Sequence, residues 1–272
     1  MIVKDALKEA SLRLKDSCER PQFEAELLLA FFLQKSRVWL HTYSDKRVEN
    51  IEWYFVLISR REANEPYEYI VESVSFYDID LYIKDGVLIP RPETEILIDK
   101  VAELIEKNSI KSIAEIGVGS GAISIVLARK FKDLKIVATD LYDTPLKVAR
   151  QNIQSFNLVN QIKLIKSNLI DKVEEKIDLV ISNPPYIANN FKLKSNVVDY
   201  EPKEALFGGE IGDELLKNII LDVQKRDIRF LACEMGYDQK EPLAEFFKQN
   251  NIDNYQFYQD LAGLDRGFIV EF

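Results

Sequence analysis

The chain beyond residue 93 alternates apolar runs with helix-like stretches, and this alternation constrains the fold more than any other feature. Strands are expected at residues 112–117, 135–140, 162–167, 177–182 and 228–234. Because parallel neighbours in a sheet need crossover connections, the pattern predicts an α/β, doubly wound and mainly parallel sheet. Two final runs, around residues 255–258 and 267–272, are joined by too few residues for a crossover helix. They should pair antiparallel, as the last of seven strands.

The first 68 residues repeat their apolar side chains at helical spacing and predict a small helical bundle. Residues 69–92 alternate instead as a β-hairpin linker, and residues 93–272 are expected to form the α/β domain. In "IPRPETE", Pro90 and Pro92 fix their φ angles and favour extended backbone before them. The prolines predict a stiff joint between the hairpin and the helix that follows it.

Composition narrows the classes of function. The chain carries 36 Lys and Arg against 45 Asp and Glu, a net charge of −9, and no basic block that would bind nucleic acid directly. Its first residues are charged, and no apolar run approaches the length of about 20 residues that a membrane span needs. The two cysteines lie far apart in sequence. A cytoplasmic protein without a membrane partner is therefore expected. A monomer is expected as well.

The stretch "AEIGVGSGAIS" predicts a cofactor loop. Gly117, Gly119 and Gly121 follow an apolar run and open a helix, where the missing Cβ atoms let a ligand approach the backbone. Asp140 ends the next strand, where a carboxylate can accept both ribose hydroxyls of an adenosine. The glycines alone suit a nicotinamide dinucleotide or S-adenosylmethionine equally, but Glu115 favours the ligand with a cationic head and a sulfonium.

A second motif, "SNPPY", predicts an acceptor site. Asn183, Pro184, Pro185 and Tyr186 follow a fully apolar run, at the sheet edge where ligands bind. The Asn183 side-chain oxygen and the Pro184 carbonyl can hold a planar NH₂ group by both hydrogens, and Tyr186 offers a ring for stacking. The only histidine, His41, lies in the helical half, so a histidine-based or metal-based mechanism is not expected.

In this order, "RPETE", "EIGVGSG", "ATD", "SNPPY", "EPKEALFGG", "CEMGYDQ" and "DLAGLDRGF" resemble the bacterial glutamine methyltransferases that modify peptide-chain release factors. The resemblance covers nearly the whole chain and implies a Rossmann-like methyltransferase sheet, with a helical half that docks the release factor. It implies methyl transfer from S-adenosyl-L-methionine to the glutamine of the substrate's Gly-Gly-Gln motif. The cofactor site that it implies comprises Gly117, Val118, Gly119, Ser120, Gly121, Asp140, Asn168 and Asn183.

The same resemblance implies that Asn183, Pro184, Pro185 and Tyr186 bind the substrate, with Asn183, Pro184 and Tyr186 as catalytic residues. One position departs from the family: Asn168 stands where an acidic or aromatic residue usually lies near the adenine. The motif "NPPY" serves any planar NH₂ acceptor, so a ribosomal-protein glutamine methyltransferase and a nucleic-acid amino methyltransferase stay open. The acidic composition argues against the second, and the intact "NPPY" argues against a non-catalytic adenosine-binding module.

Overall fold

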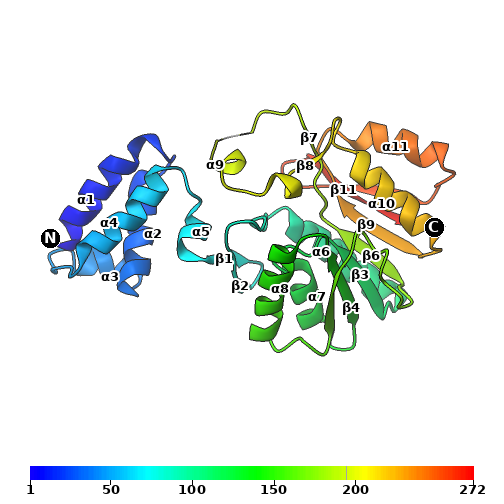
Figure 1. The fold of residues 1–272 in the computed structure, drawn as a ribbon, viewed down its shortest axis with the longest axis horizontal. Coiled ribbons are helices and arrows are strands. Elements are labelled where there is room, and N and C mark those ends of the chain that lie inside the picture. Colours follow the sequence, from blue (N-terminus) through cyan, green and yellow to red (C-terminus); the bar gives the residue numbers. More distant parts are fainter. Residues whose placement is uncertain (194) are drawn as a thin grey trace. The chain divides into compact units, whose positions relative to one another are not determined.

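The computed structural model describes residues 1–193 and 195–272 (Figure 1). Contacts within the chain divide it into two compact units. The first comprises Met1–Ser73 with Leu193–Tyr200, and the second comprises Val74–Lys192 with Glu201–Phe272. Among the described residues, no helix combines the length and the apolar character needed to cross a membrane.

The first unit is the helical bundle that the sequence predicts. Its elements are α1 (Val3–Arg13), η1 (Leu14–Asp16), α2 (Pro21–Leu33), α3 (Arg37–Thr42), α4 (Ile51–Glu62), α5 (Tyr67–Val71) and the short α9 (Ser195–Val198). Apolar side chains of α1, α2 and α4 form its core, in which Tyr54 is fully buried. The Tyr54 hydroxyl donates a hydrogen bond of 3.0 Å to the Ala25 carbonyl, so this polar group is paired inside the core.

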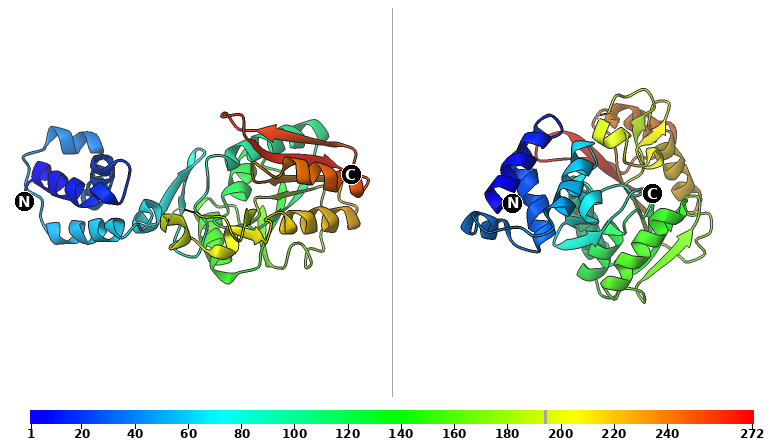
Figure 2. Two further views of the ribbon diagram at one scale, coloured as in Figure 1. Left: turned by 90° about the horizontal axis from the view of Figure 1, so that it is seen from above. Right: turned by 60° about the vertical axis from the view of Figure 1, so that its left-hand side comes forward.

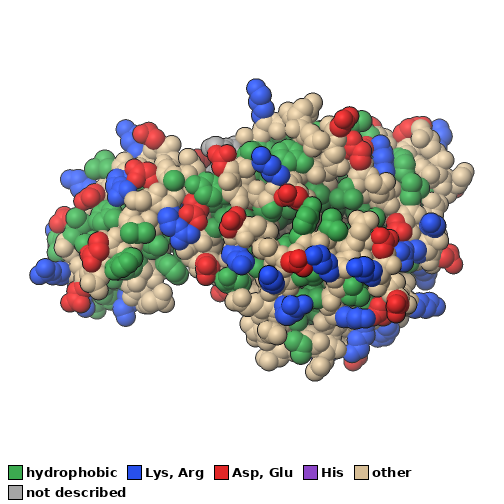
Figure 3. All heavy atoms as spheres, viewed as in Figure 1, with side chains coloured by type: hydrophobic (Ala, Val, Ile, Leu, Met, Phe, Trp, Pro, Cys, Tyr) green, Lys and Arg blue, Asp and Glu red, His purple; other side chains and the backbone are tan. Residues whose placement is uncertain are grey.

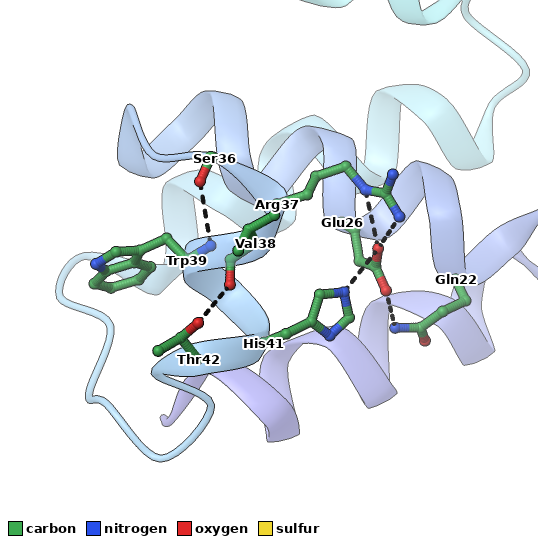
Figure 4. Close-up of polar contacts among 8 residues, drawn as sticks. All are labelled: Gln22, Glu26, Ser36, Arg37, Val38, Trp39, His41 and Thr42. Atoms are coloured by element: carbon green, nitrogen blue, oxygen red, sulfur yellow. Dashed lines mark hydrogen bonds and ion pairs between the residues drawn. The ribbon is translucent and has the colours of Figure 1, made fainter.

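A buried carboxylate joins α2 to α3 in this bundle (Figure 4). Glu26 is 4% exposed and accepts hydrogen bonds from Gln22 Nε2 at 2.8 Å and from Arg37 Nε at 3.0 Å. The Nε2 atom of His41 lies 3.5 Å from the same carboxylate. Burial acts to raise the pKa of Glu26, but the bonds from Gln22 and Arg37 outweigh it and lower this pKa.

The second unit contains the predicted seven-stranded sheet, in the order β10-β11-β9-β6-β3-β4-β5. Its strands are β3 (Ser112–Ile116), β4 (Lys135–Asp140), β5 (Ile162–Lys166), β6 (Leu179–Ser182), β9 (Phe230–Glu234), β10 (Tyr255–Gln259) and β11 (Asp265–Glu271). β11 pairs antiparallel with both β10 and β9, whereas β3, β4, β5, β6 and β9 run parallel. The sequence-based fold class, including the antiparallel last strand, is confirmed.

Helices cover both faces of this sheet (Figures 1 and 2). They are α6 (Thr94–Asn108), α7 (Ala122–Lys130) and α8 (Asp143–Ser155) on one face, and α10 (Glu214–Lys225) and α11 (Lys240–Gln249) on the other. A small parallel pair, β7 (Ile187–Ala188) with β8 (Phe207–Gly209), and the turn η2 (Lys203–Ala205) lie outside the main sheet. On the face drawn in Figure 3, Lys and Arg side chains lie among Asp and Glu side chains.

The hairpin is shorter than its alternating sequence indicates. Its strands are β1 (Ser73–Phe76) and β2 (Ile79–Tyr82), whereas residues 69–71 belong to α5. Pro66 precedes that helix, and Glu72 ends it in the left-handed conformation at φ 53°. The Tyr77 backbone N–H donates to Glu95 Oε1 and its hydroxyl donates to Asp99 Oδ1, so the turn of the hairpin is attached to α6.

The stiff joint is held by one buried carboxylate. Glu201, which is 4% exposed, accepts a hydrogen bond of 3.2 Å from the Ile89 backbone N–H and forms an ion pair with Arg91. Both partners belong to the second unit, as does the whole hairpin beyond Ser73. The joint is therefore fixed against the segment that carries "EPKEALFGG".

Candidate active site

A cavity of about 800 Å³ opens at the carboxyl ends of β3, β4 and β6. This edge is where ligands bind in doubly wound sheets. The cavity is lined by both predicted motifs: residues 117–120 and Asp140 from the first, and Asn183, Pro184 and Pro185 from the second. Asn168 and Glu115 also line it. The sequence-predicted cofactor loop and acceptor motif therefore face one cavity.

The glycine loop leaves open space beside its backbone. A Cβ atom built on Gly117 or Gly119 would meet no atom within 4 Å, and both residues have positive φ angles, of 75° and 54°. The loop is held in place because the Gly117 and Val118 N–H groups each donate to the Thr139 carbonyl at 2.9 Å. A ligand can thus lie directly against this backbone.

Asp140 lies beside the loop, and its carboxylate has acceptor positions that no hydrogen bond within the described part of the chain uses. Its Oδ2 accepts from the Gly119 N–H at 3.2 Å and its Oδ1 from the Tyr142 N–H at 3.0 Å. A carboxylate offers about four acceptor positions, so two hydroxyl donors can still be accommodated. Burial raises the pKa of Asp140. Asn168 is exposed, and its amide donates to Asp171 Oδ2 at 3.4 Å.

Glu115 lies under the loop at 1% exposure. Its Oε2 accepts hydrogen bonds from the Ser124 backbone N–H, at 3.1 Å, and from the Ser124 hydroxyl. Burial raises the pKa of Glu115 to about 8. A positive charge in the adjoining cavity would stabilise the ionised form of this group. With the open glycine backbone and Asp140, it fits an adenosine ligand that carries positive charge.

The acceptor motif is supported by two buried side chains to which sequence analysis assigned no role. The Asn183 Nδ2 donates to Thr94 Oγ1 at 2.9 Å, and the Thr94 hydroxyl donates to Glu234 Oε2 at 2.7 Å. Tyr186 donates its hydroxyl to Glu234 Oε1 at 3.0 Å. Thr94 and Glu234 are 4% and 1% exposed. They stand in "RPETE" and "CEMGYDQ", the motifs that were the only signal for them.

Tyr186 is placed differently from its neighbours in the motif. It does not line the cavity with Asn183, Pro184 and Pro185, and its ring packs against the apolar core of the second unit. Burial first, and then the charge of Glu234, raise the pKa of the Tyr186 hydroxyl. Its carbonyl accepts from Gln239 Nε2 at 2.9 Å. The contacts of Tyr186 thus connect the acceptor motif to the sheet and to residues 236–239.

Glycines let the rim of the cavity approach the acceptor motif closely. A Cβ on Gly208 would lie 2.4 Å from the Pro185 carbonyl oxygen, and one on Gly212 would lie 2.5 Å from the Tyr186 oxygen. Gly212 has a φ of 101°. Pairing of β7 with β8 holds this approach. Residues of "EPKEALFGG", among them Pro202, Glu204 and Gly208, thus line the cavity beside the acceptor motif. Across the described residues, acidic, His and Cys side chains form no cluster of three that could hold a metal ion.

Comparison with known proteins gives two family matches. Residues 5–71 match the model described as PrmC N-terminal domain, and residues 92–201 match the methyltransferase small domain. A release factor glutamine methyltransferase of Clostridium acetobutylicum is 34% identical over 98% of this chain and 97% of its own. Those of Clostridium botulinum and Dictyoglomus turgidum are 37% and 42% identical, over 98% and 79% of this chain and 98% and 77% of theirs.

Solved structures with a similar fold include the catalytic domain of human METTL16 bound to an RNA hairpin of the MAT2A 3′ untranslated region. Its TM-score is 0.58 at 21% identity, over 71% of this chain and 76% of that one. The N-terminal domain of human METTL16 in complex with SAH has a TM-score of 0.54 at 22% identity, over 71% and 76%. At identities this low, the structural similarity shows a shared fold and nothing further.

Proposed function

This chain belongs to the release factor glutamine methyltransferases, and we propose that it uses S-adenosyl-L-methionine to methylate the glutamine of a release factor's Gly-Gly-Gln motif. The methyl group would be attached to the side-chain amide nitrogen. One observation carries the proposal: an open glycine backbone with Asp140 and Glu115 shares a single cavity with Asn183 and Pro184. That cavity can hold a cationic adenosine cofactor and a planar amide together.

Each cofactor-binding residue would contact a different part of S-adenosylmethionine. Asp140 would accept the ribose hydroxyls, the backbone at residues 117–120 would contact the ligand closely, and Glu115 would face its positive charge. Gly121 does not line the cavity and lies against Ile125 and Ala149. Asn168 would lie near the adenine, where its amide can hydrogen-bond the ring. S-adenosylmethionine would supply a methyl group already activated by attachment to a sulfonium.

Asn183 and Pro184 would position the acceptor. The Asn183 Oδ1 and the Pro184 carbonyl accept the two hydrogens of the substrate NH₂ group and direct the nitrogen toward the methyl carbon. Bound there, the cofactor would supply an electrophilic methyl group and leave as a neutral thioether, and the proton that the amide nitrogen releases would pass to solvent. Because amide nitrogens are poor nucleophiles, alignment of the reacting atoms is the main contribution of these residues.

The helical residues 1–68 would bind a remote surface of the release factor and raise its local concentration at the cavity. The two glycines before the target glutamine would let its backbone enter a narrow opening, which few other glutamines permit.

The test is methylation of an intact release factor, read by mass spectrometry of the peptide that contains the motif. We expect a single-methyl mass gain on the glutamine and none on a substrate in which that glutamine is replaced by alanine. Ribosomal proteins and RNA or DNA oligonucleotides serve as competing substrates. Their methylation in place of the release factor would contradict the proposal and select one of the alternatives.

A further inference from the structure

We propose that Thr94 and Glu234 form a hydrogen-bond relay that fixes which end of the Asn183 amide faces the acceptor, and that this orientation selects an amide over a carboxylate. The inference rests on the proposed function and concerns residues to which that function assigns no role. Thr94 and Glu234 are positioning residues, because they act through Asn183.

Strand register places the relay at the cavity. β6 and β9 are parallel neighbours in which Ser182 pairs with Cys233. Asn183 directly follows the end of β6, and Glu234 is the last residue of β9, so the two lie side by side. Thr94 is the first residue of α6, which contacts β9. Three segments separated by 89 and 140 positions in sequence thus meet at one sheet edge.

The direction of each hydrogen bond follows from the groups present. Glu234 accepts from both hydroxyls, through Oε2 from Thr94 and through Oε1 from Tyr186. Burial raises the pKa of Glu234, and these two hydrogen bonds act to lower it. The Thr94 hydroxyl has one proton, which leaves its oxygen as an acceptor toward Asn183. The Asn183 NH₂ therefore faces Thr94, and its Oδ1 is left for the cavity.

A reversed Asn183 amide would bring two acceptors together. Its Oδ1 would face the Thr94 oxygen, whose proton is already engaged, at a site where Thr94 is 4% exposed. Buried unpaired acceptors are costly, so the relay excludes this orientation. With Oδ1 toward the cavity, the NH₂ of glutamine is bound, whereas the oxygens of glutamate would be repelled.

The test compares Thr94→Val, which keeps the shape and removes the hydroxyl, with Thr94→Ser, which restores it. We expect Thr94→Val to lower kcat by about 10- to 100-fold on release factor, with an unchanged Kd for S-adenosylhomocysteine, and Thr94→Ser to recover most of the turnover. A second readout is the ratio of Kd values for release factors with Gln or Glu in the motif. The preference for Gln over Glu should become smaller in Thr94→Val, because the Asn183 side-chain amide can then rotate and present its NH₂ group to the cavity.

Tyr77→Phe is the matched control, since it removes a tyrosine hydroxyl that donates to the Asp99 carboxylate at 2.7 Å, at the hairpin turn and outside the relay. It should keep wild-type turnover, whereas Tyr186→Phe should lower it. Wild-type kcat in Thr94→Val, or equal loss in Thr94→Ser, would overturn the relay. So would a Gln-to-Glu ratio that Thr94→Val leaves unchanged. Absence of turnover in the wild-type enzyme would instead refute the proposed function.

Discussion

At the scale of single residues, a substitution of Asn183 should impair acceptor binding and leave cofactor binding intact. Asn183→Ala removes the amide that would hold the substrate, while Asp140 and the glycine loop keep their contacts. We expect kcat to fall by about 100-fold or more, with the Kd for S-adenosylhomocysteine within about twofold of wild type. Single-turnover kinetics and calorimetry measure the two quantities.

The control for this change is Asn108→Ala, which removes an amide bonded to the Leu104 carbonyl within α6. It should leave both quantities as in the wild type. Normal turnover in a folded Asn183→Ala protein would refute the assignment of Asn183 as the acceptor clamp.

Glu115 makes cofactor binding depend on pH. Its pKa of about 8 in the folded chain, against an ordinary 4.5, leaves the group mostly neutral near pH 7. A cation in the cavity favours the ionised form. Affinity for S-adenosylmethionine should therefore increase by about 10- to 100-fold from about pH 6 to pH 8, with release of a proton. Calorimetry in buffers of different ionisation enthalpy detects that proton.

In Glu115→Gln, the part of the pH dependence of cofactor affinity that this carboxyl causes should vanish. The decisive quantity is therefore the difference between the pH profiles of the wild type and the variant.

The raised pKa of Glu115 also makes the stability of the fold depend on pH. Because the folded ligand-free chain holds the extra proton between pH 4.5 and about 8, its free energy of unfolding should fall as pH rises through that window. An identical pH profile for the variant would exclude Glu115 as the source.

At the scale of elements, Glu26 fastens α3 to α2 (Figure 4). Glu26→Gln keeps the shape but loses the charge that Arg37 contacts. We expect the free energy of unfolding at neutral pH to fall by about 1–3 kcal/mol in urea titrations. The lowered pKa of Glu26 means that its ionised form stabilises the fold above the ordinary value of 4.5, and this contribution is lost as pH falls through the folded pKa.

Glu9→Gln on the exposed surface of α1 is the matched control, and it should change stability little. A loss in Glu26→Gln that stays constant down to acidic pH would show that the charge of Glu26 is not its cause.

Helices and strands that are determined by nearby residues in the sequence were predictable. Apolar periodicity located the strands of the main sheet, and the short connection before β11 fixed its antiparallel direction. Contacts between distant segments were not predictable. α5 replaces the start of the hairpin because Pro66 and Glu72 bound a single helical turn, and β7 pairs with β8 only through glycines that allow close approach. Thr94 and Glu234 meet across 140 positions, which no local pattern indicates.

At the scale of the whole molecule, the net charge of −9 should speed encounter with a basic, RNA-facing substrate loop. Exposed charges are screened beyond about 8 Å at physiological ionic strength. We therefore expect KM for release factor to rise severalfold when salt increases from about 0.05 M to about 0.3 M, with kcat nearly constant. A KM independent of salt would contradict electrostatic steering, and sucrose at matched osmolarity controls for changes in water activity.

The position of β11 between β9 and β10 also has a consequence for synthesis of the chain. Until β11 has left the ribosome and paired, β9 has one free edge, since its partner there is not yet present. Such an edge invites pairing with other chains. Because the ribosomal exit tunnel covers the most recently made residues, this edge is exposed only at the end of synthesis and just after release. Chaperone contact should be strongest at that stage, which purification of chaperone complexes with stalled full-length chains and with released chains would reveal. Contact that ends while β9 is still being synthesised would contradict it. An enzyme of translation termination would thus be most vulnerable just after the termination of its own synthesis.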